Sequence, residues 1–390
     1  MDYRIPFSGR AHSYNNEELN LILEIAKSAS PLTQGENLRK FQEKFRKYSN
    51  SRYSFAVSNA TAALELTAQL CQFSPGDEVI IPGHTYTASA YPFLKKGAKI
   101  VWADIDKETR VISVESFKKS ISNKTKAVVV VHLYGYGADI EEIIKIARER
   151  KILVIEDAAQ ALGVRVNKKM VGTYGDFGIF SFHSHKNIST LGEGGMLTLK
   201  EKKFADIIPM LRHNGHIDFN FKRENYWIPA MGNVDIPELN GEKIWPNNYC
   251  LGEVECALGE KLLDRIDEIN LFKRERALKF IDELKNFENI IFHRVENDRH
   301  NYHLLVARLK RDRDKFIEMM SISGIQCAVQ YYPLYRYDLY KKVGQGESDC
   351  PNTDDFFDNM VSFPFQHSLS DKDFHWMIKQ TKLCLQKLND

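Results

Sequence analysis

Short apolar runs alternate with amphipathic segments along much of the chain, and this alternation predicts the fold class. Residues 151–155 form a short, largely apolar run, preceded by Ile140, Ile143 and Ala147 at helical spacing. Such a run is typical of a parallel strand that is buried on both faces. Because similar strand and helix patterns alternate from about residue 51 to 200, we expect an α/β fold with a mostly parallel central sheet and helices on both faces.

The second half of the chain carries longer periodic patterns, which predict a second, smaller domain. Apolar residues recur at helical spacing over residues 250–277, so we expect one long helix leading into that domain. A chain of 390 residues is long enough for two domains, and we place the boundary near residue 250. Further elements expected beyond it are strands over 302–309 and 326–332 and a final helix over 372–388.

Composition and charge favour a cytoplasmic enzyme. The net charge is only +2, which gives no indication of nucleic-acid or membrane-surface binding. The start of the chain lacks the apolar core of a secretory signal, and the longest apolar run, residues 127–133, is too short to span a bilayer. The six cysteines show no metal-ligand spacing, so we expect reduced thiols and no metal site.

The chemistry is carried first by Lys186, which follows the apolar run 177–182 and precedes the glycine-rich stretch 190–195. A single lysine is ordinarily a solvated surface charge. A lysine that follows the end of a buried strand is better placed to lose its proton and act as an amine nucleophile.

Three other strand ends carry suitable partners. Asp157 follows the strand at 151–155, where open α/β sheets bind ligands. It could merely cap the next helix, but a carboxylate facing the ring nitrogen of pyridoxal phosphate would keep that nitrogen protonated. Thr61 begins an alanine-rich helix whose N-terminus suits a phosphate, and Tyr86, after the strand at 77–81, could stack on a flat ring or cover the core.

These segments, in this order, resemble the DegT/DnrJ/EryC1/StrS family of sugar aminotransferases, which depend on pyridoxal 5′-phosphate (PLP). The most specific motifs are EDAAQALG at 156–163 and SFHSHKNISTLGEGG at 181–195, and the resemblance covers nearly the whole chain. It implies fold type I, the aspartate aminotransferase architecture. Residues 1–250 would form the large PLP-binding domain, with the first residues contacting the small α+β domain at 251–390.

The resemblance also implies the roles of individual residues. Lys186 would form the Schiff base with the cofactor, and Asp157 would pair with the pyridine nitrogen. Gln160 would contact the side of the ring hydroxyl, and Tyr86 would stack on the ring. Ala60, Thr61 and Ser181 would hold the phosphate, and His183 would be a structural neighbour rather than the base.

Residues 213–248, rich in asparagine, glycine, proline and aromatic residues, either pack their own side chains or shape the substrate pocket. In the family the matching stretch reaches a neighbouring active site, which implies a homodimer in which Asn248 contacts the partner's cofactor phosphate. The chain departs from the family pattern with Pro246 for Gly, Cys250 for Arg, and Gln330 where many members have His. We therefore expect the acceptor to be anchored by Arg223, Tyr226 and Trp227.

The resemblance implies transfer of an amino group from glutamate to a keto sugar, expected to be nucleotide-linked, in amino-sugar biosynthesis for a surface polysaccharide or a secondary metabolite. A cyclitol or a small phosphorylated ketone is the alternative acceptor. Two other classes are weighed: a PLP-dependent sugar dehydratase, in which His replaces the Schiff-base lysine, and a non-catalytic regulatory protein. Lys186 argues against the dehydratase, although His183 and His185 lie beside it in the sequence and keep that class as an alternative. The presence of both Lys186 and Asp157 argues against the regulatory protein.

Overall fold

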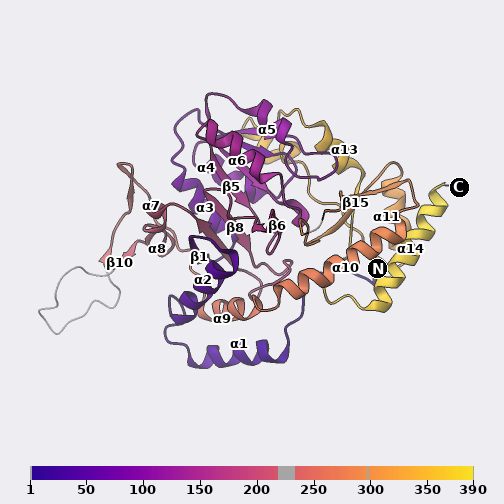
Figure 1. The fold of residues 1–390 in the computed structure, drawn as a ribbon, viewed down its shortest axis with the longest axis horizontal. Helices are drawn as coiled ribbons and strands as arrows, with labels where there is room; N and C mark the ends of the chain where they lie inside the picture. Colours follow the sequence, from indigo (N-terminus) through magenta and orange to yellow (C-terminus); the bar gives the residue numbers. More distant parts are fainter. Residues whose placement is uncertain (1, 218–232, 297, 390) are drawn as a thin grey trace, which may run out of the picture.

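A seven-stranded sheet forms the centre of the computed structural model, which describes residues 2–217, 233–296 and 298–389 (Figure 1). In this sheet β9 is antiparallel to both of its neighbours, and every other pair of neighbouring strands is parallel. The mostly parallel α/β fold predicted from the sequence is therefore confirmed. In spatial order the strands are β1 (Tyr53–Val57), β9 (Gly195–Leu199), β8 (Phe177–Ser181), β5 (Leu153–Asp157), β4 (Thr125–Val131), β2 (Glu78–Pro82) and β3 (Lys99–Ala103).

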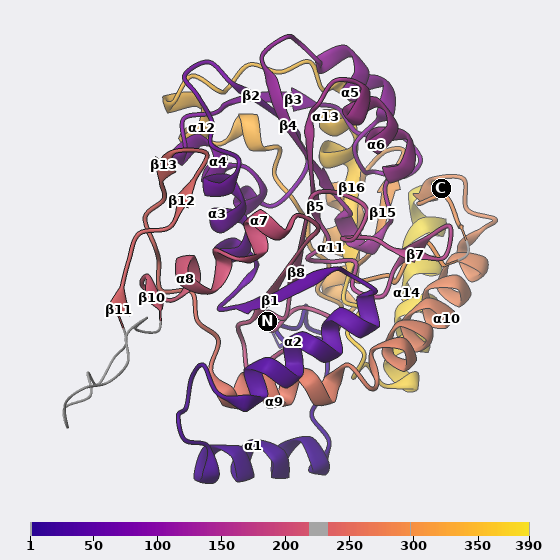
Figure 2. The ribbon, with the colours of Figure 1, turned by 60° about the vertical axis from the view of Figure 1, so that its left-hand side comes forward.

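Helices cover both faces of this sheet. Figure 2 shows α3, α4 and α8 on one side of the strands, and α5 and α6 on the other. The helices of this half of the chain are α1 (Asn16–Ser28), α2 (Glu36–Ser49), α3 (Ala60–Leu70), α4 (Tyr91–Lys95), α5 (Val114–Ser120), α6 (Ile140–Glu149), α7 (Lys202–Ala205) and α8 (Ile208–Arg212). Short elements join them: the strands β6 (Arg165–Val166) and β7 (Lys169–Met170), and the 3₁₀ turns Thr87–Ser89 and Leu133–Gly135.

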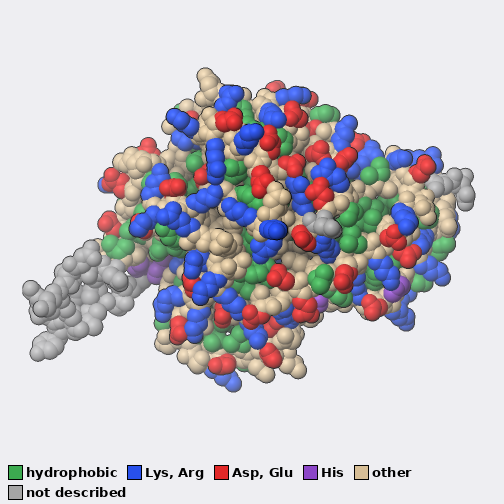
Figure 3. All heavy atoms as spheres, in the orientation of Figure 1, with side chains coloured by type: hydrophobic (Ala, Val, Ile, Leu, Met, Phe, Trp, Pro, Cys, Tyr) green, Lys and Arg blue, Asp and Glu red, His purple; other side chains and the backbone are tan. Residues whose placement is uncertain are grey.

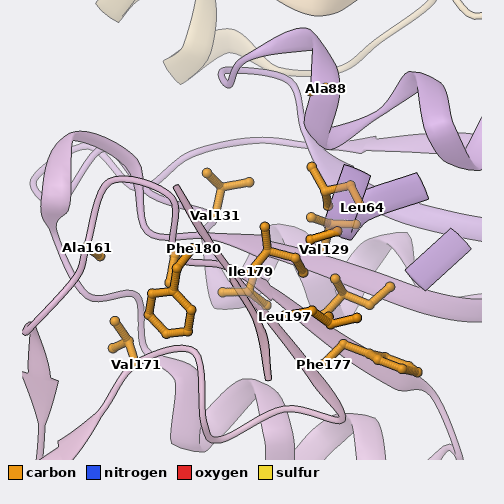
Figure 4. Packing of buried hydrophobic residues seen from close by; sticks show 14 of the residues in the cluster. Leu64, Ala88, Val129, Val131, Ala161, Val171, Phe177, Ile179, Phe180 and Leu197 are labelled. Atoms are coloured by element: carbon orange, nitrogen blue, oxygen red, sulfur yellow. The ribbon is translucent and has the colours of Figure 1, made fainter. Parts of the chain in front are cut away.

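The strands are continuous apolar runs because both faces of the sheet are buried. Every residue of β8 is buried, and two consecutive residues of this strand, Ile179 and Phe180, point to opposite faces of the sheet. Figure 4 shows Ile179 with Leu197 and Leu64 of α3, while the ring of Phe180 points away from them. On its own face Phe180 contacts Phe45 of α2, with ring centroids 5.0 Å apart. The sheet is therefore packed on both faces next to its carboxyl edge.

A second hydrophobic cluster forms around a three-stranded antiparallel sheet. Ile5, from the start of the chain, belongs to this cluster, and its N–H donates to Gly324 O (2.9 Å). The strands of the sheet are β14 (Ile290–Phe292), β15 (Leu305–Leu309) and β16 (Met360–Phe363). The helices of this half are α9 (Glu253–Leu262), α10 (Ile266–Leu284), α11 (Arg313–Ile322), α12 (Asp338–Lys342), α13 (Pro351–Asn359) and α14 (Asp371–Asn389), with a 3₁₀ turn at Leu334–Arg336.

The helix α10 belongs to both clusters. Ile266 and Ile269 pack in the first cluster, and Ala277, Phe280 and Leu284 pack in the second. The helix therefore ties the central sheet to the smaller sheet along one continuous axis.

Two predicted elements of this half are wrong. The single helix over 250–277 is two helices, α9 and α10, separated by a turn at residues 263–265 that redirects the chain. The strand over 326–332 does not form, because only Ala328 pairs with Ser362 before the chain turns towards the cavity described below. The strand predicted over 302–309 is shorter, as β15, and the helix predicted over 372–388 corresponds to α14.

The described parts of the 213–248 segment form two short antiparallel strand pairs: β10 (His216–Ile217) with β11 (Asn233–Val234), and β12 (Glu238–Leu239) with β13 (Glu242–Lys243). On the face shown in Figure 3, basic and acidic side chains are interspersed. Across the described residues, no helix has the length and apolar character needed to cross a bilayer.

Candidate active site

A cavity of about 420 Å³ lies at the carboxyl edge of the central sheet. Asp157 is the last residue of β5 and Ser181 is the last residue of β8, so the strands deliver both side chains to this edge. The N-terminus of α3 borders the same space. The sequence-predicted residues that line the cavity are Ala60, Thr61, Tyr86, Asp157, Gln160, Ser181, His183 and Lys186.

Lys186 lies in the loop between β8 and β9, and it is half-buried. Burial lowers the pKa of its amine to about 8, and the nearby Asp157 carboxylate opposes this shift. An ordinary lysine has a pKa above 10, so its amine is almost entirely charged near neutral pH. Lys186 instead keeps a substantial neutral fraction there, as an amine nucleophile requires.

The carboxylate of Asp157 is held in place on both of its oxygens. Ser89 Oγ donates to Oδ2 (2.7 Å), and the Ala159 N–H donates to Oδ1 (3.1 Å). Ser89 is itself bonded to Thr85 through their hydroxyls (3.0 Å). Asp157 is 7% exposed, so its charge acts in a site with little water. Ser89 was not predicted from the sequence, because no strand end or motif marks it.

Gln160 connects the cavity wall to a distant part of the chain. Its Oε1 accepts from the Tyr134 N–H (2.7 Å), and its Nε2 donates to the Tyr331 hydroxyl (3.0 Å). Tyr331 therefore lines the cavity from the segment that was predicted to be a strand. Tyr86, which is 57% exposed, contacts the edge of the same tyrosine ring, with centroids 6.4 Å apart.

The start of α3 offers donors for an anion. Its N-cap is Asn59, whose side chain accepts from the Ala62 N–H (2.9 Å). The first amides of a helix have no acceptor within the helix, so Ala60 and Thr61 are free to bind a negative group. Gly195 of β9 makes this approach possible: a Cβ there would lie 2.4 Å from the backbone C of Asn59.

His183 and His185 also line the cavity beside Lys186. Burial lowers the pKa of the His183 ring, with a smaller effect from the charge of Lys186. The His183 Nε2 lies 3.9 Å from a carboxylate oxygen of Glu193. His183 is therefore a neutral neighbour of the lysine under ordinary conditions.

The structure does not bring Asn248 into this cavity. Asn248 is exposed and pairs with His213 through a backbone bridge. Cys250 is half-buried, and its thiol lies 3.5 Å from the carbonyl of Arg212. Arg223, Tyr226 and Trp227, predicted to anchor the acceptor, lie outside the residues that the structure describes.

Two buried cavity residues were missed in the sequence: Lys273 of α10, which is 2% exposed, and His303, which is 4% exposed. A signal for Lys273 existed, because it stands between Ile269 and Ala277 at helical spacing, on the buried face of the helix. His303 gave no such signal, since it precedes β15 and reaches the cavity only through the tertiary fold.

A mostly parallel sheet with a lysine, a carboxylate and a helix N-terminus at its carboxyl edge defines a fold type I enzyme that depends on PLP. The chain belongs to the DegT/DnrJ/EryC1/StrS aminotransferase family, whose model matches residues 12–381. It is accordingly a PLP-dependent aminotransferase.

Relatives and solved structures agree with this family. The chain is 34% identical over 367 residues to an uncharacterized protein of Methanocaldococcus jannaschii, covering 92% of each chain. It is 31% identical over 366 residues to the GDP-perosamine synthase of Escherichia coli O157:H7, covering 93% of each. The fold matches PseC of Helicobacter pylori, an aminotransferase involved in the biosynthesis of pseudoaminic acid, with a TM-score of 0.88 at 23% identity, covering 98% of this chain and 99% of that one.

Proposed function

We propose that this aminotransferase moves an amino group from glutamate to a keto sugar carried on a nucleotide, in the biosynthesis of an amino sugar. The observation that carries the proposal is the Lys186 amine, with a pKa of about 8, in one cavity with the Asp157 carboxylate and the start of α3. The name of the GDP-perosamine synthase, to which the chain is similar, supports a nucleotide-linked substrate. A surface polysaccharide or a secondary metabolite is the expected destination, and the cytoplasm the expected location.

The cavity residues fit PLP at both of its ends. Ala60 and Thr61 at the start of α3, together with the Ser181 hydroxyl, would hold the phosphate. At the other end, Asp157 would face the ring nitrogen and Gln160 the ring hydroxyl, while the exposed ring of Tyr86 would cover one face. When bound, PLP supplies an electron sink that makes the exchange of an amine for a ketone possible.

The residues of the chain divide the remaining work. Lys186 provides an amine that is partly neutral near neutral pH. This amine would hold the cofactor covalently and, once released, would serve as the base that moves a proton. Asp157, whose carboxylate is oriented by Ser89, would place a negative charge opposite the ring nitrogen. Aromatic and apolar residues line part of the cavity and would limit the access of water to these groups.

We propose further that the active form is a homodimer with composite sites. Asn248 is exposed and lies outside the cavity of its own chain, which supports a role in a neighbouring chain. Within this proposal Asn248 contacts the partner's cofactor phosphate, and Arg223, Tyr226 and Trp227 bind the acceptor. A cyclitol or a small phosphorylated ketone is the second candidate for that acceptor.

The decisive experiment separates the two half-reactions. The purified enzyme, loaded with PLP, is mixed with glutamate, and the release of 2-oxoglutarate is measured in a single turnover. The enzyme that now carries the amino group is then mixed, in parallel experiments, with nucleotide-linked keto sugars, cyclitol ketones and small phosphorylated ketones. Release of 2-oxoglutarate followed by amination of a nucleotide-linked sugar supports the proposal. No release contradicts glutamate as the donor, and amination of another ketone alone contradicts the acceptor class.

A further inference from the structure

Lys273 of α10 is a buried lysine that lines the cavity, and the roles proposed above leave it unused. It is 2% exposed and has hydrogen-bond partners but, among the described residues, no ion pair with a carboxylate. Burial lowers the pKa of its amine to about 7. Burying a lysine without a carboxylate partner lowers the stability of the folded protein, unless its hydrogen bonds compensate for the lost hydration.

The bonds of Lys273 lead directly to the loop that carries Lys186. Its Nζ donates to Asn187 Oδ1 (2.9 Å) and to the carbonyl of His303 (2.9 Å). Asn187 follows Lys186 in the chain, and it is 5% exposed. The amide of Asn187 is held at its other end too, since its Nδ2 donates to Asn270 Oδ1 (2.8 Å), one turn earlier on α10.

The same loop is held from the other side by the start of the chain. The Ala11 N–H donates to Ser184 O (3.1 Å), and the Ser189 N–H donates to His12 Nε2 (2.9 Å). These contacts fix the loop before and after Lys186. The hydrogen bonds from α10 fix Asn187, the residue next to Lys186, so that a shift of this part of the loop would move the Lys186 amine directly.

We propose that Lys273 is a positioning residue for Lys186: through Asn187 it fixes where the Lys186 amine lies relative to Asp157. This inference rests on the role proposed for Lys186. The amine of a lysine lies at the end of a flexible four-carbon stem, so a shift of the backbone that carries it also shifts the positions the amine can reach. If the loop relaxed, the Lys186 amine would gain water and its pKa would rise from about 8 towards its ordinary value.

The test measures Lys186 in the protein without cofactor. Limiting acetic anhydride labels neutral amines, and peptide mass spectrometry gives the extent of labelling of Lys186 across pH. The titratable or charged groups around Lys186 include Asp157, His183, His185, Glu193, His303 and Lys273. All of them except Lys273 are unchanged in the Lys273→Met variant. In Lys273→Met we expect the apparent pKa of Lys186 to rise by about one unit, which makes labelling at pH 7 about tenfold slower.

Two further variants keep the test decisive. Lys279→Met removes an exposed lysine from the same helix, and the labelling profile of Lys186 should not change. The double variant Lys273→Met with Asn187→Leu replaces both partners by apolar groups, which removes the Asn187 Oδ1 acceptor that Lys273→Met would leave unpaired, in case the single variant fails to fold. The profile should shift there as well.

The outcomes separate the two proposals. A lower melting temperature with an unchanged Lys186 profile, in whichever of the two variants folds, would show that Lys273 is only structural. An ordinary pKa for Lys186 in the unaltered protein would instead contradict the proposed function, before any variant is compared.

Discussion

Ser89 donates a hydrogen bond of 2.7 Å to Oδ2 of Asp157, from a 3₁₀ turn that lies 68 residues earlier in the chain. The other carboxylate oxygen accepts from the Ala159 N–H. With both oxygens engaged, the carboxylate has one orientation in the cavity. The serine thus sets the direction in which the negative charge of Asp157 acts.

Ser89→Ala is expected to lower the rate of the glutamate half-reaction about tenfold, because a hydrogen bond to a charged group is worth about 1.5–3 kcal/mol. Cofactor occupancy should stay near normal, since Ser89 is not among the residues that would hold the phosphate. Single-turnover release of 2-oxoglutarate measures the rate. Ser116→Ala, which removes the hydroxyl that accepts from the Asp104 N–H, is the control, because neither residue lines the cavity. An unchanged rate in Ser89→Ala would contradict the orienting role.

Asp157→Asn should lower transamination by about 10²- to 10³-fold, because the negative charge opposite the ring nitrogen is lost where it matters in the transition state. Cofactor binding, measured by fluorescence titration, should change far less. Asp176→Asn is the matched control: Asp176 accepts from the Val154 N–H (2.8 Å) near the opposite end of the same strand, so its loss should affect stability and not turnover. Near-normal turnover in Asp157→Asn would mean that another group serves the ring.

Mixing inactive Lys186→Ala chains with inactive Asn248→Ala chains should restore about a quarter of the wild-type activity. With random pairing, half of the dimers are hybrids, and each hybrid has one site free of both changes. Activity is measured after exchange of subunits has been demonstrated by labelled chains. If both parents are impaired and exchange is complete, yet no activity returns, the site is not shared between chains.

Stability should fall as the pH drops below about 6.5. Burial lowers the pKa of His84 to about 3, of His300 to about 3, and of His293 well below its ordinary value. Below about pH 6.5 these histidines bind protons in the unfolded chain but not in the folded protein. Each of them therefore lowers the free energy of unfolding by about 1.4 kcal/mol per pH unit, until the pH reaches its folded pKa.

Urea unfolding at pH 7.5 and pH 5.5 measures this loss. His293→Phe should flatten the pH dependence, whereas His375→Gln, on the exposed side of α14, should leave it unchanged. Carboxylates contribute equally to both variants and cancel in the comparison. An identical slope in His293→Phe and the unaltered protein would contradict the assignment.

The parts of the site that sequence could predict are those placed by local structure. Asp157 and Ser181 end apolar strands, and Thr61 begins a helix, so the carboxyl edge of the sheet collects them by topology alone. Tyr331 and Lys273 reach the cavity from other parts of the fold, through contacts that span many residues. The sequence around Tyr331 does not indicate which surface it faces, and the helical spacing around Lys273 indicates a buried position but not the cavity that it lines.

The two wrong elements have the same origin. Apolar periodicity continues through residues 263–265 with no glycine or proline, so nothing local marked the turn between α9 and α10. At residues 326–332 the β-forming residues were present, but Ala328 alone finds a strand partner, in β16. In both places packing between distant segments overrode the local preference.

Gly195 restricts which parts of the cavity can change during evolution. Its missing side chain lets β9 lie against the first residues of α3, so any larger residue there would displace the cradle at the start of that helix. The mouth of the cavity carries no such restriction, and Tyr86 stands there more than half exposed. We expect descendants of this chain to acquire new acceptors through changes around Tyr86, while Gly195 and the start of α3 stay unchanged.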